Sequence, residues 1–368
     1  PGFLVSWFPS FLVSCFPGFL VSWFPGSLPS SGLGFLGFLV SWFPAFYGSW
    51  CAGALVSWSL EFDGHCSSAD INDGLVFLSE SDNLHCIEIE YGELLWSSEL
   101  EGSCDLVKFS NEGIWVTSSV YSLEIQDYYD SAVWLFDYQG GLMEKWSIEG
   151  RAWSLDSVSQ AAIIGLSRPK CGYCTVTREE GVKYHSLDIS SPVTVGMSSH
   201  KGALLGHSDG SMSHVTMDGS YSTSIGEGSV SALSMHEDWV IGMDSGELVS
   251  GDNMGSWKVE LGGIVDLVKL GPSPDGGSCV WASSWSDSCK LSLLETHSGL
   301  EKMKILHGDR VSVGSSVPRI IALGDNCGRV FLLEDEVIGR RRNQVDRNLD
   351  DDKKSELLRR KIRELRMK

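Results

Sequence analysis

The sequence has few cysteines and few cations for its length. Ten cysteines in 368 residues are too sparse for the disulfide framework that stabilises small secreted domains. We find no basic segment followed by an apolar run at the start, so no secretion signal is predicted and a reducing, cytoplasmic setting is expected. Only 28 Lys and Arg stand against 48 Asp and Glu, for a net charge of −20. This charge argues against nucleic-acid binding by the surface as a whole, because phosphates are repelled.

The sequence also lacks an uninterrupted run that could span a membrane. Its most apolar stretch is GFLVSWFP at 2–9, which recurs as SFLVSCFP at 10–17 and as GFLVSWFP at 18–25 and 37–44. A proline closes each copy, well short of the ~20 residues that a spanning helix needs. We interpret residues 1–50 as a low-complexity octapeptide repeat, disordered or spurious, ahead of a true start near residue 50. The alternatives are an extension that faces lipid or a partner, and a solenoid domain.

Patterns that carry catalysis or metal binding are missing or incomplete. The run GHSDG at 206–210 fits the nucleophile elbow of hydrolases, but its register is that of a hairpin turn with no helix after it. Cys171 and Cys174 form a lone C-x-x-C without a second ligand pair. The nine histidines show no H-x-x-x-H or H-E-x-x-H spacing. We therefore predict no catalytic, cofactor-binding or metal-binding residue, no cofactor, and a protein that is not an enzyme.

What the sequence does contain is a repeat. Seven similar segments follow one another at intervals of 36 to 48 residues, beginning at Gly74, Gly113, Ala161, Gly202, Asp238, Cys279 and Arg319. Each has an apolar run, a turn rich in Asp, Ser, Asn and Gly, an alternating run and a second glycine turn. Another short apolar run lies between segments, as in DLVKFS at 105–110. Four strands per repeat of about 40 residues is typical of a propeller blade.

The fold class predicted is all-β, a seven-bladed β-propeller of four-stranded blades over residues 51–338, followed by a charged helical tail at 339–368. The seventh segment ends after its third strand, and ALVSWSLEF at 54–62 is expected to supply the fourth and to close the ring. Closure removes the exposed sheet edges that invite aggregation. Tryptophans recur at one position of several blades, where we expect them to pack: Trp58, Trp96, Trp146 and Trp257.

Two blade phrases carry a resemblance to known proteins. The runs DWVIGMDSGELV with GSW at 238–257 and SDNLHCIEIEYGELLW at 81–96 resemble those of quinoprotein-like and WD40-like β-propellers. The Gly-His and Trp-Asp dipeptides of WD40 repeats do not recur at fixed places, so no single family is assigned. A quinoprotein-like protein would stack a quinone or other cofactor at the ring centre, which gives the enzyme alternative, but the cofactor residues of that class have no match here.

The longest repeat interval holds an insertion, VYSLEIQDYYDSA at 120–132. Tyrosine beside acidic groups suits contact with a basic partner, and propeller insertions lie in exposed loops. We therefore predict a partner-binding role for Tyr121, Asp127, Tyr128 and Tyr129. An ordinary solvated loop is the alternative.

The tail carries the opposite charge from the rest of the chain. Residues 340–368 hold 12 Lys and Arg against six Asp and Glu, which leaves −26 on residues 1–339. The run KKSELLRRKIRELRMK at 353–368 predicts a helix with one apolar face. Its cations are the second set of predicted partner-binding residues: Arg359, Arg360, Arg363 and Arg366. The alternatives are a solvated helix docked on the acidic body, a partner helix, and an arm for RNA or a membrane surface.

The function expected from these features is a non-catalytic scaffold that mediates protein–protein interactions. A rigid, monomeric ring offers loops on two faces, and the tail offers a second contact. Nucleic-acid association through the basic tail alone is kept as an alternative, and no membrane span is expected.

Overall fold

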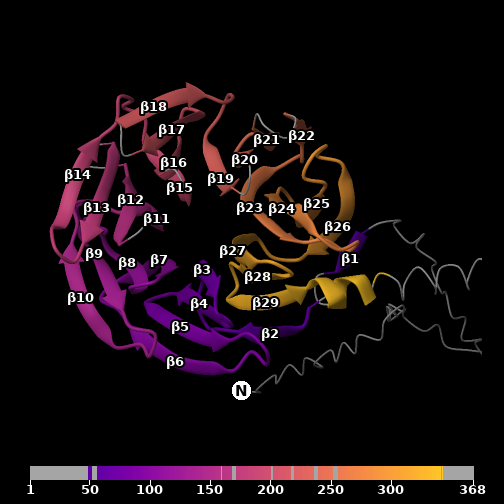
Figure 1. Cartoon of the computed structure of the whole chain (residues 1–368), viewed down its shortest axis with the longest axis horizontal. Coiled ribbons are helices and arrows are strands. Elements are labelled where there is room, and N and C mark those ends of the chain that lie inside the picture. Colours follow the sequence, from indigo (N-terminus) through magenta and orange to yellow (C-terminus); the bar gives the residue numbers. More distant parts are fainter. Residues whose placement is uncertain are drawn as a thin grey trace, which may run out of the picture. The chain divides into compact units, whose positions relative to one another are not determined.

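The computed structural model describes residues 49–51, 56–158, 160–167, 171–199, 202–216, 219–235, 239–251, 256–340 and 342. Within them, seven blades of four antiparallel strands stand in a ring, as Figure 1 shows. The innermost strands of the blades line a central cavity, which we call the channel. The prediction of a seven-bladed β-propeller is confirmed. The octapeptide copies at 2–44 and the tail from 343 onward lie outside the described residues.

The first three blades follow one another along the chain. Blade 1 consists of β3 (Cys66–Asn72), β4 (Leu75–Glu80), β5 (Asn83–Glu88) and β6 (Leu94–Glu99). Blade 2 consists of β7 (Ser103–Ser110), β8 (Gly113–Ser122), β9 (Asp127–Phe136) and β10 (Leu142–Ser147). Blade 3 consists of β11 (Ala152–Val158), β12 (Ala161–Leu166), β13 (Gly172–Thr177) and β14 (Gly181–Ser186).

The next three blades continue this order. Blade 4 consists of β15 (Val193–Ser199), β16 (Gly202–His207), β17 (Ser211–Thr216) and β18 (Gly219–Ser224). Blade 5 consists of β19 (Val230–Met235), β20 (Trp239–Met243), β21 (Glu247–Ser250) and β22 (Lys258–Glu260). Blade 6 consists of β23 (Ile264–Pro272), β24 (Ser278–Trp285), β25 (Cys289–Leu294) and β26 (Glu301–His307), with β1 (Ser49–Cys51) added in parallel outside β26.

Blade 7 joins the two ends of the ring. It consists of β27 (Val311–Val317), β28 (Ile320–Asp325), β29 (Arg329–Glu334) and the early strand β2 (Trp58–Glu61). Strand β2 pairs antiparallel with β29, from Trp58 opposite Leu332 to Glu61 opposite Arg329. The predicted closure by an N-terminal strand is confirmed.

Every inner strand carries a β-bulge at the same place against the second strand of its blade, as at Cys66/Ser68 and Val311/Val313. The inner strands all begin at one face of the ring, which we call face A, and end at the other, face B. The first hairpin turns therefore lie on face B and the second on face A. At Asp73 and Gly74, both with positive φ, the face B turn of blade 1 takes the mirror-image form that suits the twist of a tight hairpin.

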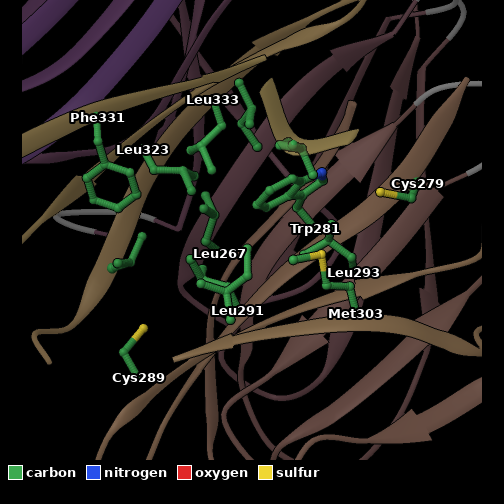
Figure 2. Packing of buried hydrophobic residues seen from close by; sticks show 14 residues of the cluster. Leu267, Cys279, Trp281, Cys289, Leu291, Leu293, Met303, Leu323, Phe331 and Leu333 are labelled. Atoms are coloured by element: carbon green, nitrogen blue, oxygen red, sulfur yellow. The ribbon is translucent and has the colours of Figure 1, made fainter. Parts of the chain in front are cut away.

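The hydrophobic core is divided among the seven spaces between blades. The described residues form seven clusters, and each contains buried or partly buried side chains of two adjacent blades. The largest joins blades 6 and 7 and is shown in Figure 2. Trp281 lies fully buried in it and donates its indole N–H to the Pro272 carbonyl at 2.9 Å. Polar satisfaction of this kind lets a large aromatic side chain fill a dry core.

The recurring tryptophans build joints between blades. Three of them donate the indole N–H to a carbonyl of the next blade: Trp58 to Ile89, Trp96 to Tyr138 and Trp257 to Thr296. A glycine of positive φ lies against each ring, where an added Cβ would come within 3 Å: Gly92, Gly140 and Gly299. Trp146 differs, because its ring packs 5.5 Å from that of Trp115. The predicted packing role of these tryptophans is confirmed.

After β29 the chain forms a short helix at 335–340, whose Ile338 is buried in the cluster of blades 6 and 7. Because β29 runs from face A to face B, this helix lies at face B. Arg342 contacts Asp275 of the β23–β24 turn at 2.6 Å, on the same face. Within the described part of the chain, no helix has the length and apolar character needed to cross a membrane.

Candidate interaction surface

The insertion predicted from the sequence lengthens one hairpin of blade 2. Strands β8 and β9 have ten residues each, more than any other strand that the structure describes. Their turn, with Gln126 at positive φ, projects from face A. Four large side chains of the hairpin are exposed to solvent: Tyr121 by 48%, Leu123 by 86%, Ile125 by 61% and Tyr129 by 64%. Burying such groups against a partner is favourable, because apolar surface leaves water.

A series of stacked side chains leads from this hairpin to the mouth of the channel. The rings of Tyr121 and Tyr128 meet edge to face with centroids 5.1 Å apart. The Arg151 guanidinium lies 5.1 Å from the Tyr128 ring and 5.0 Å from the Trp153 ring. It also donates from Nη1 to the Tyr128 hydroxyl at 2.7 Å. Trp153 is 41% exposed and lines the channel, so the series connects the hairpin to the ring centre.

A buried carboxylate fixes Arg151 in this position. Asp105 accepts a hydrogen bond from Arg151 Nη2 at 2.7 Å and another from the Ser119 hydroxyl. Burial raises the pKa of Asp105, while the hydrogen bond from Ser119 and the charge of Arg151 oppose that rise. Asp105 belongs to blade 2 and Arg151 precedes the inner strand of blade 3, so the ion pair also joins two blades. Asp266 and Arg310 form the equivalent pair between blades 6 and 7, at 2.6 Å.

The hairpin is acidic as well as aromatic. Glu124, Asp127 and Asp130 lie on it, and the sequence has no Lys or Arg between Lys108 and Lys145. Arg151, the cation that stacks on Tyr128, is already paired with Asp105. The surface therefore combines the exposed acidic side chains of Glu124 and Asp130 with exposed apolar side chains, which suits a segment that is basic and aliphatic.

The structure brings together the partner-binding residues predicted in the insertion at 120–132. The residues predicted in the C-terminal tail are not described. Tyr121, Asp127, Tyr128 and Tyr129 all lie on the β8–β9 hairpin, although Tyr128 is half-buried beneath Arg151. The predicted tail residues Arg359, Arg360, Arg363 and Arg366 lie outside the described residues. The last described residues, 335–340 and 342, lie on face B, the face opposite the hairpin.

Sequence reasoning did not find Arg151, Trp153, Leu123 or Ile125. Leu123 and Ile125 were part of the insertion and could have been found from their place beside the expected turn. Arg151 gave a weaker signal, because it stands just before a predicted inner strand and meets Asp105 only through the blade arrangement. No spacing rule links the two.

The motifs considered for catalysis have structural roles. Ser208 lies in the hairpin turn between β16 and β17, and a strand follows it where a hydrolase elbow needs a helix. Cys174 is buried on β13, and burial raises the pKa of its thiol to about 12. A thiol with so high a pKa is a poor nucleophile and redox group at neutral pH.

One cluster on face A has ligand types that metals accept. His307, Asp309 and Asp325 offer atoms within 4.8 Å of one another. Arg329 supplies the positive charge there, since its guanidinium pairs with Asp309 and lies 3.1 Å from Asp325. His307 Nε2 lies 2.8 Å from Asp325. We interpret the cluster as an ion network that holds the β28–β29 turn.

The same network gives blade 7 a predicted dependence on pH. Burial alone would raise the pKa of Asp325, but hydrogen bonds from His307 and from the backbone N–H groups of Arg329 and Cys327 outweigh burial and lower it. A lowered pKa means stability that is present above the unfolded value of about 3.9 and is lost as pH falls through the folded value. We expect Asp325→Asn to cost roughly 1.5–3 kcal/mol at pH 7.

Urea unfolding of both proteins at pH 7, 5, 4 and 3.5 tests this expectation. The difference in unfolding free energy between wild type and Asp325→Asn should be constant from pH 7 to pH 5 and should narrow below about pH 4. A difference that stays the same at every pH would show that the charge of Asp325 has no such role.

Comparisons with known proteins place the fold. No family model matches the sequence, and no curated protein matches it. Among solved structures, the β-propeller domain of Cps50 (Swd1) from Myceliophteria thermophila matches with a TM-score of 0.61 at 12% identity, over 76% of this chain and 99% of that one. The WD40 domain of Neurospora crassa Pan2 matches with a TM-score of 0.57 at 10% identity, over 74% and 89%. This fold is the one that WD40 domains adopt.

A third match is one chain in a structure of the mitotic checkpoint complex, with a TM-score of 0.61 at 13% identity. The match covers 83% of this chain and 99% of that one. Identity at this level shows the WD40-like fold alone. The quinoprotein-like part of the sequence resemblance stays a prediction.

Proposed function

We propose that this protein is a non-catalytic scaffold that binds a partner protein through the β8–β9 hairpin and the Arg151–Trp153 series on face A. The observation that carries the proposal is the lengthened hairpin, whose Tyr121, Leu123, Ile125 and Tyr129 are 48% to 86% exposed. Exposing four large side chains on one projecting element disfavours the free protein, and an interface offsets that disadvantage.

The chemistry of the surface describes the partner. Glu124 and Asp130 supply exposed negative charge to the hairpin, and the aromatic rings supply flat apolar area. A partner segment that alternates Lys or Arg with Leu, Ile or Met matches both properties. Its charges would speed the encounter, and its apolar side chains would hold the complex.

The fold supports this proposal by analogy. A WD40-like ring is a rigid support with loops on two faces, and one of the structural matches comes from a multiprotein complex. Analogy of fold does not identify a partner, so the proposal depends on the hairpin itself.

The test is affinity purification of the full chain from its native source, with nuclease present, for the wild type and for the double variant Leu123→Ser/Ile125→Ser. Both side chains point into solvent, so their replacement leaves the ring stable. We expect proteins that copurify with the wild type to be reduced at least about tenfold with the variant, the effect of losing ~1.4 kcal/mol of binding.

The matched control is Leu94→Ser/Leu95→Ser, which removes two leucines that are 50% and 51% exposed on β6 of blade 1. This control should keep every partner. If the hairpin variant and the control retain the same proteins, face A of blade 2 is not the binding surface. Raising the salt concentration should accelerate release from the wild type, because the acidic hairpin attracts a basic segment.

A further inference from the structure

The inner strands place one residue of each blade in the same layer of the central channel. The layer lies two residues past the bulge on every inner strand, and its members in blade order are Asp70, Lys108, Asp156, Met197, Ser234, Lys269 and Ser315. Two aspartates and two lysines thus share one level of a channel whose cavity is about 320 Å³.

Three of these charges are bound to one another. Lys108 Nζ lies 3.4 Å from Asp70 and 3.8 Å from Asp156. Burial lowers the pKa of Lys108, but the charges of the two aspartates outweigh burial and raise it. The ammonium of Lys108 therefore stays protonated between two carboxylates.

Each carboxylate oxygen already accepts at least one hydrogen bond. Asp70 accepts hydrogen bonds from the Phe109 backbone N–H at 2.9 Å and from the Ser315 hydroxyl at 2.9 Å. Asp156 accepts from the backbone N–H groups of Ser157 and Ser198 at 2.7 and 2.6 Å. All four carboxylate oxygens are thereby in use.

Lys269 is the fourth charged residue of the layer, and it forms no ion pair with the described residues. It lines the cavity, and among the described residues no carboxylate lies within 4 Å of its ammonium and no acceptor forms a hydrogen bond with it. Burial lowers the pKa of Lys269, and the neighbouring Lys108 charge lowers it further, while Asp70 and Asp156 oppose both effects. Lys269 is half-buried and its Nζ is not one of the buried polar atoms that lack a partner. Its N–H donors therefore face the cavity and are available to a ligand.

We propose that the channel binds a small oxyanion, a carboxylate or phosphate group, on the ammonium of Lys269, with the charge of Lys108 beside it. A cavity of about 320 Å³ is at the small end of ligand sites, which favours a compact molecule. An anion there would be held by the ammonium of Lys269, while Lys108 keeps its contacts with Asp70 and Asp156. This site lies deep in the channel and is independent of the hairpin surface.

The test measures thermal unfolding of the purified full chain at constant ionic strength while chloride is replaced by sodium phosphate or by sodium acetate. We expect the midpoint to rise by about 2–4 °C with one of the two probes. The probe that acts identifies the group as phosphate or carboxylate. After denaturation, the supernatant of untreated protein is analysed for released anions by mass spectrometry.

Three variants separate the channel from the surface. Lys269→Met should abolish the midpoint rise, Lys269→Arg should retain it, and Lys290→Met should behave as wild type. Lys290 is a lysine of β25 in the same blade that does not line the cavity. Phosphate also stabilises proteins through exclusion from their surface, and that effect would be equal in all four proteins.

The proposal is overturned if Lys269→Met shows the same rise as wild type. It is also overturned if neither probe moves the wild-type midpoint and no anion is released, a result that does not depend on any variant folding.

Discussion

Asp70→Ala is expected to lower the free energy of unfolding by about 3 kcal/mol. Asp70 is buried and accepts hydrogen bonds or an ion pair from Lys108, the Phe109 N–H and Ser315, groups that belong to blades 2 and 7 while Asp70 belongs to blade 1. Its removal leaves the Lys108 ammonium with only the longer contact to Asp156 and leaves the part-buried N–H of Phe109 without an acceptor. Both losses fall on the folded state alone.

Urea denaturation followed by intrinsic tryptophan fluorescence measures this effect. Asp63→Ala is the matched control, because Asp63 is an exposed aspartate just before the same inner strand, and it should change stability by less than about 0.5 kcal/mol. Equal midpoints for the two variants would mean that the channel layer does not hold the three blades together.

Gly140→Ala is expected to cost about 2–4 kcal/mol, whereas Gly181→Ala is expected to cost about 1 kcal/mol. Both glycines lie in the second face B turn of a blade and have positive φ, +84° and +68°. A Cβ at Gly140 would lie 2.8 Å from the Trp96 ring, while a Cβ at Gly181 would meet nothing within 4 Å. The pair therefore separates the strain of positive φ from the contact that joins blades 1 and 2.

Calorimetric unfolding of both variants checks this expectation. The midpoint of Gly140→Ala should fall well below that of Gly181→Ala. If the two midpoints fall together, the backbone strain is the whole effect and the tryptophan joint tolerates a methyl group. Trp96→Phe/Gly140→Ala should recover part of the loss, because the smaller ring leaves room.

The sequence was sufficient for the blade count and for ring closure. A four-strand period of about 40 residues leaves few alternatives, and the missing fourth strand of the last repeat pointed to the run that contains β2. The tryptophan position was also readable, because Trp96, Trp146 and Trp257 follow the second glycine turn of their repeats by two to five residues. The glycine that meets Trp96 is Gly140, the first of two adjacent glycines in the second turn of that repeat.

The side-chain contacts that form the candidate sites could not be predicted from the sequence. Asp105 meets Arg151 across 46 residues, and Ser315 meets Asp70 across 245. Such pairs depend on which residue follows the bulge of each inner strand, and the bulge gives no signal in a hydrophobic pattern. The charged layer of the channel could be seen only after the inner strands had been aligned by their pairing.

The pairing of β2 with β29 can form only late in the synthesis of this protein. Trp58 pairs with Leu332, which is translated about 270 residues later. At translation rates of 5–20 residues per second, that interval is roughly 15–55 s. Throughout it, β2 has no strand to pair with, and six blades form an open arc with two bare ends. A ribosome that stalls within blade 7 would therefore release an incomplete ring whose two ends both invite association with other chains, although most of its blades are finished.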